Sequence, residues 1–391
     1  MVARPKESIA AYLKRNGRGI ILQAAALLSA VLAVAYFIFN AATNLENQGI
    51  ATGFGFLNST AGFDIIQHYI DYDESSSYGR AFLVALINTL VISALGIVLA
   101  TILGFGVGIA RLSSNWLVAK IAMVYVETLR NIPLLLQIFF WYFAVLRTLP
   151  PPRQSIDLGG IIFLNIRGLY VPSPSLTQEA YSLLAVGLIG AGVAVGLIVY
   201  NQYLIRQNKS KIAALPWGIG GTILALILTY IILDEPITWS TPSLQGFDFE
   251  GGAVLIPEFV ALLTALATYT ASFIAEIVRA GLIAVDKGQK EAAASLGLSW
   301  MHTLRFVVIP QAMRIIIPPL SSQYLNLTKN SSLAAAIAYP DIVLIFSGIV
   351  LMQTGQAVEV VTITMAVYLA ISLTISLLMN WYNHRTKMIE N

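Results

Sequence analysis

The apolar stretch AFLVALINTLVISALGIVLATILGFGVGIA, residues 81–110, decides the fold class of this chain. It contains no charged side chain, and about 20 apolar residues are enough to cross the ~30 Å hydrocarbon core of a bilayer as a helix. Similar apolar stretches lie near residues 19–40, 117–147, 181–204, 213–233, 253–280, 311–351 (interrupted) and 357–380. The sequence therefore predicts an all-α, polytopic membrane protein with about eight transmembrane helices.

The composition also points to a membrane-embedded body. The 391 residues are 57% hydrophobic and only 11% charged, against roughly 25% charged residues in a soluble domain. The net charge of +3 is too small to suggest nucleic acid as a partner, and the chain has no cysteine for disulfides or thiol chemistry. His68, His302 and His384 are far apart and lack metal-ligand spacing, so no metal site is expected.

The N-terminus has the outline of a signal peptide, because Lys14, Arg15 and Arg18 precede an apolar run from Gly19 to Phe39. That run is longer than the apolar region of a signal peptide, which has ~7–15 residues. No small-x-small cleavage site follows it closely. We expect a retained first span, with a cleaved signal peptide as the alternative.

The charges of the connecting segments predict the orientation. Basic residues gather at the N-terminus, around Arg111 and Lys120, in 205–212, in 279–314 and at the C-terminus, and acidic residues dominate 41–80 and 234–252. Cytoplasmic loops are enriched in Lys and Arg, so both termini are expected in the cytoplasm. Only the loop 148–180 is ambiguous, since Arg153 and Arg167 lie on its predicted outer side. We expect the long outer loops to be solvated connections, because prolines interrupt any helix in 148–180.

One cytoplasmic stretch, VDKGQKEAAASLGLSWMHTLRFVVIPQ, residues 285–311, has the local signals of a helical elbow. The run from Lys287 to Leu296 favours helix, and Gly297 can end it in a left-handed turn. Ser299 can cap a second helix, which we expect to run until Pro310. Two short helices meeting at an angle form a unit stiff enough to transmit force.

This elbow resembles the cytoplasmic signature of the integral subunits of binding-protein-dependent ABC importers. The signature is Glu-Ala-Ala, three residues, Gly, nine residues, then Ile-x-Leu-Pro, and the matching residues here are Glu291, Ala292, Ala293, Gly297, Val307, Ile309 and Pro310. In that family the element is the coupling helix that docks on the ATPase. The resemblance implies that Glu291 and Gly297 contact the nucleotide-binding subunit and that the small alanines allow close approach. The alternative is an ordinary amphipathic inner loop.

Further stretches look like the polar amino acid branch of these permeases, namely YVETLRNIPLLLQIFFWYF (125–143), YTASFIAEIVRAGLIAVDKGQKEAA (269–293) and LNLTKNSSLAAAI (325–337). The layout, with extra helices at 19–40 and 181–233, is similar to the larger permease of general L-amino acid uptake systems. It implies an N-terminal region 1–80, a transport domain 81–383 with an inserted helix pair near 181–233, and a tail 384–391.

The resemblance also implies partners in the bacterial inner membrane: a second related permease, an ABC ATPase dimer, a periplasmic solute-binding protein and membrane lipid. The chain has no G-x-x-x-x-G-K-[ST] phosphate loop, so ATP and Mg are expected on the partner ATPase and no cofactor on this chain. The alternatives are a permease for another small polar solute or a passive channel. A membrane-embedded enzyme is disfavoured, since the sequence has neither H-E-x-x-H nor G-x-S-x-G.

Two acid–base pairs occur within the spans, Glu127 with Arg130 and Glu276 with Arg279. Residues three apart share a helix face and can neutralise each other, so we expect structural ion pairs, with gating as the alternative. Small residues four apart, Gly104 with Gly108 and Gly192 with Gly196, can let helices pack closely.

The stretch LTKNSSL is expected to break the span 311–351, because prolines flank it at 318, 319 and 340. Irregular backbone at membrane depth is tolerated where it is buried or lines a watery cavity, and helix ends there can meet a substrate carboxylate. The candidate translocation-path residues are Thr328, Lys329, Asn330, Ser331 and Ser332, with Gln137 and Asn131 beside Pro133 as weaker candidates. The alternative is a structural kink.

Overall fold

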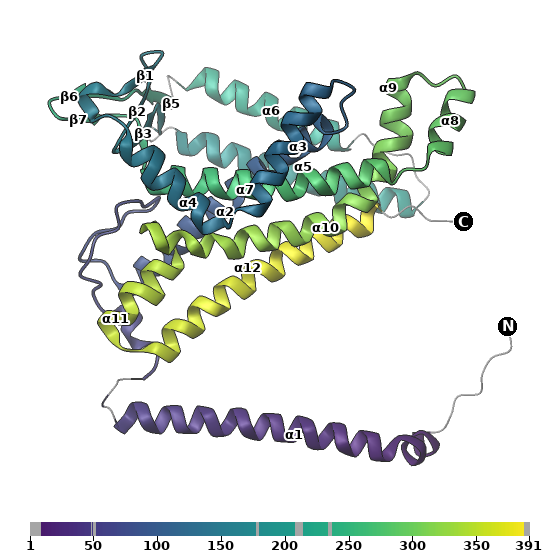
Figure 1. Cartoon of the computed structure of the whole chain (residues 1–391). Helices are drawn as coiled ribbons and strands as arrows, with labels where there is room; N and C mark the ends of the chain where they lie inside the picture. The colour runs from purple at the N-terminus through teal and green to yellow at the C-terminus, as the bar shows by residue number, and fades with distance from the viewer. Residues whose placement is uncertain are drawn as a thin grey trace. The chain divides into compact units, whose positions relative to one another are not determined.

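The computed structural model describes residues 9–47, 49, 52–176, 180–207, 214–233 and 237–386 (Figure 1). Several predicted features lie outside these residues: the basic segment up to residue 8, the greater part of the basic loop 205–212, Asp234 and Glu235 of the acidic loop, and the tail from residue 387.

The chain is mostly helical within these ranges. The helices are α1 (Ile9–Asn47), α2 (Tyr78–Ala110), α3 (Trp116–Asn131), α4 (Leu134–Phe139), α5 (Ala180–Arg206), α6 (Ala214–Ile232), α7 (Pro257–Ile283), α8 (Lys287–Ser295), α9 (Trp300–Thr303), α10 (Ile309–Asn330), α11 (Leu351–Thr354) and α12 (Ala357–Thr386). Helical turns of π type are η2 (Phe140–Val145), η5 (Leu304–Val308) and η7 (Val343–Val350), and those of 3₁₀ type are η1 (Phe54–Asn58), η3 (Leu146–Thr148), η4 (Pro152–Gln154) and η6 (Ser331–Ile337). The strands are β1 (Ile156–Leu158), β2 (Ile162–Asn165), β3 (Gly168–Val171), β4 (Ser173–Leu176), β5 (Ile237–Ser240), β6 (Ser243–Gln245), β7 (Asp248–Glu250) and β8 (Ala253–Leu255).

The polytopic character is confirmed by the lengths of these helices. Four of the described helices are long and apolar enough to cross a membrane: Tyr78–Ala110, Pro257–Ile283, Trp300–Ile337 and Ala357–Asn383. The pair Trp116–Asn131 and Leu134–Thr148, bent by 107°, makes a fifth span if it counts as one. The predicted spans at 19–40, 181–204 and 213–233 contain shorter apolar helices of 10–17 residues. The count of eight therefore stays a prediction.

The chain divides into two compact units. The first comprises Met1–Leu90 and Pro340–Leu377, and the second comprises Val91–Tyr339 and Leu378–Asn391.

In the first unit, the segment that follows α1 is packed rather than solvated. Ile65 and Tyr72 join Ala81, Phe346 and Val360 in one buried cluster. Burying an aliphatic or aromatic side chain of this size is worth about 1.5–3 kcal/mol. The expectation that the loop 41–80 is a plain solvated connection is therefore wrong for its part from residue 52 onward.

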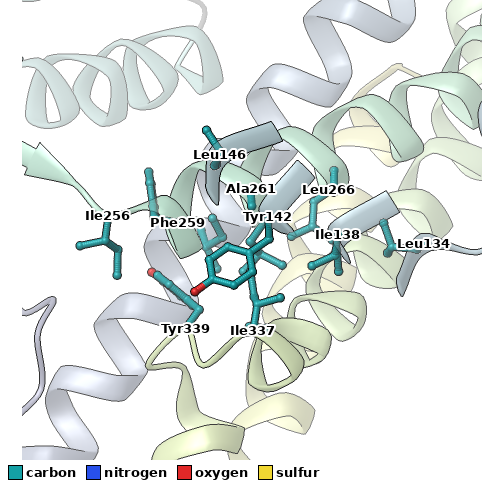
Figure 2. Packing of buried hydrophobic residues seen from close by; sticks show 14 residues of the cluster. Leu134, Ile138, Tyr142, Leu146, Ile256, Phe259, Ala261, Leu266, Ile337 and Tyr339 are labelled. Atoms are coloured by element: carbon teal, nitrogen blue, oxygen red, sulfur yellow. The ribbon is translucent and has the colours of Figure 1, made fainter. Parts of the chain in front are cut away.

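In the second unit, the core lies where α4 and η2 cross α7 (Figure 2). Ile138 and Tyr142 pack with Phe259 and Leu266, and Tyr339 is fully buried against the same cluster. The Tyr142 hydroxyl donates to Glu258 Oε1 over 2.6 Å, so its polar end is satisfied inside this apolar region. This cluster holds the bent α3–α4 segment on α7.

Close helix packing explains Gly104 and Gly108 on α2. A Cβ added to Gly104 would lie 2.6 Å from Ile274 Cβ, and one added to Gly108 would lie 2.7 Å from the Ala275 carbonyl oxygen. These contacts confirm the predicted close approach, here to α7. The same prediction is not met at Gly192 and Gly196, because a Cβ added to either would meet no described residue within 4 Å. The α5–α6 pair packs instead through Gly190 and Gly218, whose added Cβ atoms would meet Thr222 and Ala194.

Replacing Gly104 with alanine is expected to destabilise the second unit by about 1–3 kcal/mol, the usual cost of overpacking. The readout is the thermal unfolding midpoint of the purified protein. Gly106→Ala is the matched control, because a Cβ there meets nothing within 4 Å and alanine favours helix over glycine. Equal midpoints for the two variants would contradict the close approach of α2 to α7.

The all-α prediction is wrong for the two segments that flank α5 and α6. Residues from 156 to 176 and from 237 to 255 form three small antiparallel sheets, the largest in the order β1-β2-β3-β8. Strand β3 pairs with β8 through Leu169 opposite Leu255 and Val171 opposite Ala253. The prolines do exclude helix here, but apolar and aromatic residues between them suit short strands. The described part of the loop, residues 148–176, is therefore a folded part of the second unit.

The two basic residues that made the orientation of the loop 148–180 ambiguous both interact with residues between α6 and α7. Arg167 forms an ion pair with Asp248, and Arg153 lies over the Phe247 ring at 4.0 Å from its centroid. Partial burial would raise the pKa of Asp248, but hydrogen bonds from the Phe249 N–H and the Tyr170 hydroxyl, with the Arg167 guanidinium nearby, lower it below its ordinary value. Burial raises the pKa of Tyr170 to about 12, and its bond to Asp248 adds to this.

Because the Asp248 pKa is lower in the folded chain, its contribution to stability is present above the unfolded pKa of ~3.9 and is lost as the pH falls through the folded value. The pair is half exposed, so the effect should stay below about 1 kcal/mol. We expect Asp248→Asn to speed amide hydrogen exchange in β3 and β7 at pH 6, and this difference from the unsubstituted chain to narrow as the pH falls below ~3.9. A difference that persists unchanged at pH 3 would contradict the assignment.

The expected break at LTKNSSL is also misplaced. Thr328 and Lys329 lie within α10, which continues as η6 to Ile337. The chain breaks at Ala338, which has φ 59°, followed by Tyr339 and Pro340. A residue before proline is driven out of the helical conformation, so Pro340 rather than the polar stretch ends the helix.

Candidate functional site

The first helix of the elbow is capped at both ends, and its end at Gly297 is the one that the sequence predicted. Asp286 caps α8 by accepting a 2.7 Å hydrogen bond from the Gly288 N–H. At the other end, Gly297 has φ 74° and donates to the Ala294 carbonyl, while the Leu298 N–H donates to the Ala293 carbonyl. This pair of bonds is the Schellman ending, which favours glycine at the left-handed position. The turn between α8 and α9 is therefore defined by backbone geometry.

The second helix begins as predicted and ends differently. Ser299 caps α9 by accepting from the His302 N–H, and its hydroxyl lies 2.7 Å from His302 Nδ1. The helix does not end at Pro310, because η5 carries it directly into α10. Proline lacks an N–H and is tolerated in the first turn of a helix, so Pro310 marks a change of helical winding. The elbow is thus built onto the start of the membrane helix Trp300–Ile337.

The underside of the elbow is anchored to that membrane helix. Val285, Ala293 and Val308 are buried, and Gln311 Nε2 donates to Gln289 Oε1 over 3.2 Å between α10 and α8. A push on α8 therefore reaches α10 through packed contacts. Figure 1 shows α8 and α9 as two short helices joined by a tight turn.

The opposite side of the elbow carries a surface that the sequence interpretation missed. Leu296 is 80% exposed, Trp300 72% and Met301 60%; with Leu298 we refer to these residues as the apolar crest. Exposed apolar patches of this kind mark interaction surfaces. The signal was available, since these four apolar residues surround Gly297 in a polar stretch.

The signature residues divide between the two sides. Glu291, Ala292 and Gly297 are exposed, whereas Ala293 is 3% exposed and faces inward, and Pro310 is half-buried. Ala293 therefore supports the elbow rather than offering its side chain to a partner.

The two predicted ion pairs have different outcomes. Arg279 Nη2 lies 2.6 Å from Glu276 Oε1, which confirms the second pair, and Arg111 at the end of α2 bonds the other oxygen of Glu276. Glu127 and Arg130, both described, form no ion pair; Arg130 lies over the Phe273 ring, 5.0 Å from its centroid. The sequence spacing gave no indication that Arg111 would complete the second pair.

The candidate path residues fall into three groups. Thr328 and Ser331 are fully buried, and their hydroxyls donate to the Tyr324 and Thr328 carbonyls of their own helix. Lys329 is exposed, and Asn330 and Ser332 are half-buried. The buried hydroxyls are satisfied within the helix, whereas the side chain of the exposed Lys329 has no ion pair among the described residues.

Gln137 bonds backbone carbonyl groups next to Pro133. Its Nε2 donates to the Leu129 and Ile132 carbonyls, each over 2.9 Å. These carbonyls belong to the turn that Pro133 leaves without its usual backbone donors. Gln137 therefore supports the bend between α3 and α4, and Asn131 Nδ2 likewise bonds the Glu127 carbonyl.

Lys329 belongs to a polar face of α10 that extends beyond the predicted stretch. Ser322, Asn326 and Lys329 are all exposed, and their spacing of four and three residues places them on one side of the helix. We refer to these residues as the polar face. Polar groups on a membrane helix are costly against lipid and normally point to a cavity or a partner.

Comparison with known proteins decides the family. Residues 96–388 match the family described as the binding-protein-dependent transport system inner membrane component. The chain belongs to this family. The permease is 52% identical to the amino-acid ABC transporter permease protein YhdX of Escherichia coli (strain K12), over 95% of each chain. It is 46% identical to the general L-amino acid transport system permease protein AapQ of Rhizobium johnstonii, over 95% of the permease and 93% of AapQ. It is 39% identical to the glutamate/glutamine/aspartate/asparagine transport system permease protein BztB of Rhodobacter capsulatus, over 95% and 94%.

Proposed function

We propose that this permease is the membrane subunit of an ATP-driven importer that carries polar L-amino acids across the bacterial inner membrane. The observation that carries the proposal is the capped elbow, anchored below to α10 and exposing an apolar crest above. The names of its relatives, which share 39–52% of its residues over nearly the whole chain, support amino acids as the cargo.

In this proposal the elbow receives work from a separate ABC ATPase dimer that binds ATP and Mg. The crest enters a groove of the ATPase, with Glu291, Ala292 and Gly297 at its rim, while Ala293 and Pro310 keep the elbow rigid. The element then has to lie on the cytoplasmic side, and the alternation of basic and acidic loops supports the same side for both termini. The region 81–383 forms the transport domain, with the pair near 181–233 as an insertion.

The polar face of α10 lines the translocation path in this proposal. It faces a second, related permease subunit rather than lipid, because the Lys329 ammonium has no ion pair among the described residues and would cost several kcal/mol against hydrocarbon at membrane depth. A periplasmic solute-binding protein delivers the amino acid on the outer side. The α-carboxylate of the amino acid then meets Lys329 as it passes.

The test is uptake of radiolabelled L-glutamate and L-glutamine by cells that lack the chromosomal gene, with and without the plasmid-borne permease. We expect uptake to return with the permease, to compete with unlabelled polar L-amino acids, and to vanish when the partner ATPase gene is deleted. Uptake that persists without the ATPase would indicate a passive channel. No competition by any amino acid would indicate another solute.

A further inference from the structure

A basic hollow lies at the turn between α2 and α3. Its volume is about 360 Å³, and Arg111, Lys120 and Arg279 contribute to its lining together with Trp116. None of the described residues that line it is acidic. We propose that this hollow binds the phosphate headgroup of an anionic phospholipid.

The charge balance favours an anion. Glu276 is shared between Arg111 and Arg279 and neutralises one of them. Lys120 is exposed and has no ion pair among the described residues. Three cations against one carboxylate leave a local charge of +2 at the mouth of the hollow. The Glu276 contacts also hold both guanidinium groups in place, so the site needs little reorganisation to accept a phosphate.

The position of the hollow identifies the source of the phosphate as lipid. It lies where the apolar helix α2 ends at Ala110 and α3 begins at Trp116. Trp116 is 74% exposed and Ile121 62%, and tryptophan is enriched at the boundary between headgroups and acyl chains. An acyl chain can cover these side chains, whereas free inorganic phosphate gains nothing from them. Basic pockets between membrane helices on the cytoplasmic side are the sites where acidic headgroups bind.

The assignment of the lipid to the inner leaflet rests on the orientation given under the proposed function. The hollow and its charges do not depend on that orientation. Lys120 follows Trp116 by four residues on the same helix face, so its long side chain can reach the headgroup while its stem lies along apolar surface.

The experiment measures lipid retained by the purified permease complex, using native mass spectrometry during titration with phosphatidylglycerol or phosphatidylcholine. Removing one cation near an anionic lipid lowers the binding constant about fivefold, and we expect this for Lys120→Ala with phosphatidylglycerol. Lys120→Arg should restore binding. Lys290→Ala is the matched control, because it removes an exposed lysine from α8 and should leave lipid binding unchanged.

Equal phosphatidylglycerol binding by Lys120→Ala and Lys290→Ala would overturn the proposal. Displacement of the lipid by an equal concentration of inorganic phosphate would also overturn it, since the site would then be one for free phosphate. The lipid count is read without turnover, so loss of amino-acid uptake with normal lipid binding would count against the proposed function alone.

Discussion

Replacing Leu296 with aspartate lowers amino-acid uptake at least about 30-fold, because buried interface anchors contribute about 2 kcal/mol or more to binding. Leu296 is 80% exposed within the permease, so the chain itself loses little when this side chain changes. Under the proposed function, the loss falls on the contact with the ATPase, where a carboxylate would have to be buried without a partner. The readouts are uptake by cells and ATPase activity that co-purifies with the permease.

Leu296→Met is the control for this prediction, since it keeps the apolar character and nearly the volume of the side chain. It should transport and retain the ATPase as the unsubstituted permease does. Both variants should be present in the membrane at equal amounts. Normal uptake by Leu296→Asp would show that the apolar crest contacts no partner that matters for transport.

Replacing Lys329 with alanine lowers uptake about 10- to 100-fold, while the ATPase still binds. The estimate follows from the loss of one charge-assisted hydrogen bond to the substrate carboxylate, worth about 1.5–3 kcal/mol. The exposure of Lys329 beside Ser322 and Asn326 is the structural reason to expect it. The measurement is initial uptake rate together with ATP hydrolysis by the reconstituted complex.

Lys329→Arg, which keeps the positive charge, should retain a larger share of transport than Lys329→Ala. Thr328→Val provides a second comparison, because the Thr328 hydroxyl bonds only its own helix in the structure. It should transport nearly normally. A reversed order, with Thr328→Val impaired and Lys329→Ala normal, would move the path to the other side of α10.

Much of the fold could be predicted from sequence because its signals are local. An apolar run such as 81–110 indicates a span by length alone, and the end of α8 follows from Gly297 and Ser299, whose backbone preferences need no tertiary context. The Glu276–Arg279 pair was predictable for the same reason, as residues three apart on a helix meet.

What could not be predicted depends on contacts between distant segments. Arg111 completes the Glu276 pair from 165 positions away in the sequence, and strand β3 pairs with β8 although helices α5 and α6 lie between them in the sequence. The polar stretch around Lys329 looked like a helix break, yet its hydroxyls bond their own helix, and Pro340 sets the break. The predicted ion pair between Glu127 and Arg130 does not form for the same reason. The Arg130 guanidinium lies over the ring of Phe273, a residue of the distant helix α7.

The proposed function requires that the elbow faces the cytoplasm and holds an ATPase. The chain has no cysteine, so Leu296→Cys provides a single thiol on the apolar crest, to be labelled with a membrane-impermeant maleimide in vesicles of known orientation. We expect labelling in inside-out vesicles stripped of the ATPase, protection when the ATPase is added back, and no labelling in right-side-out vesicles. Labelling of intact right-side-out vesicles would place the elbow on the outer side and rule out the proposed function.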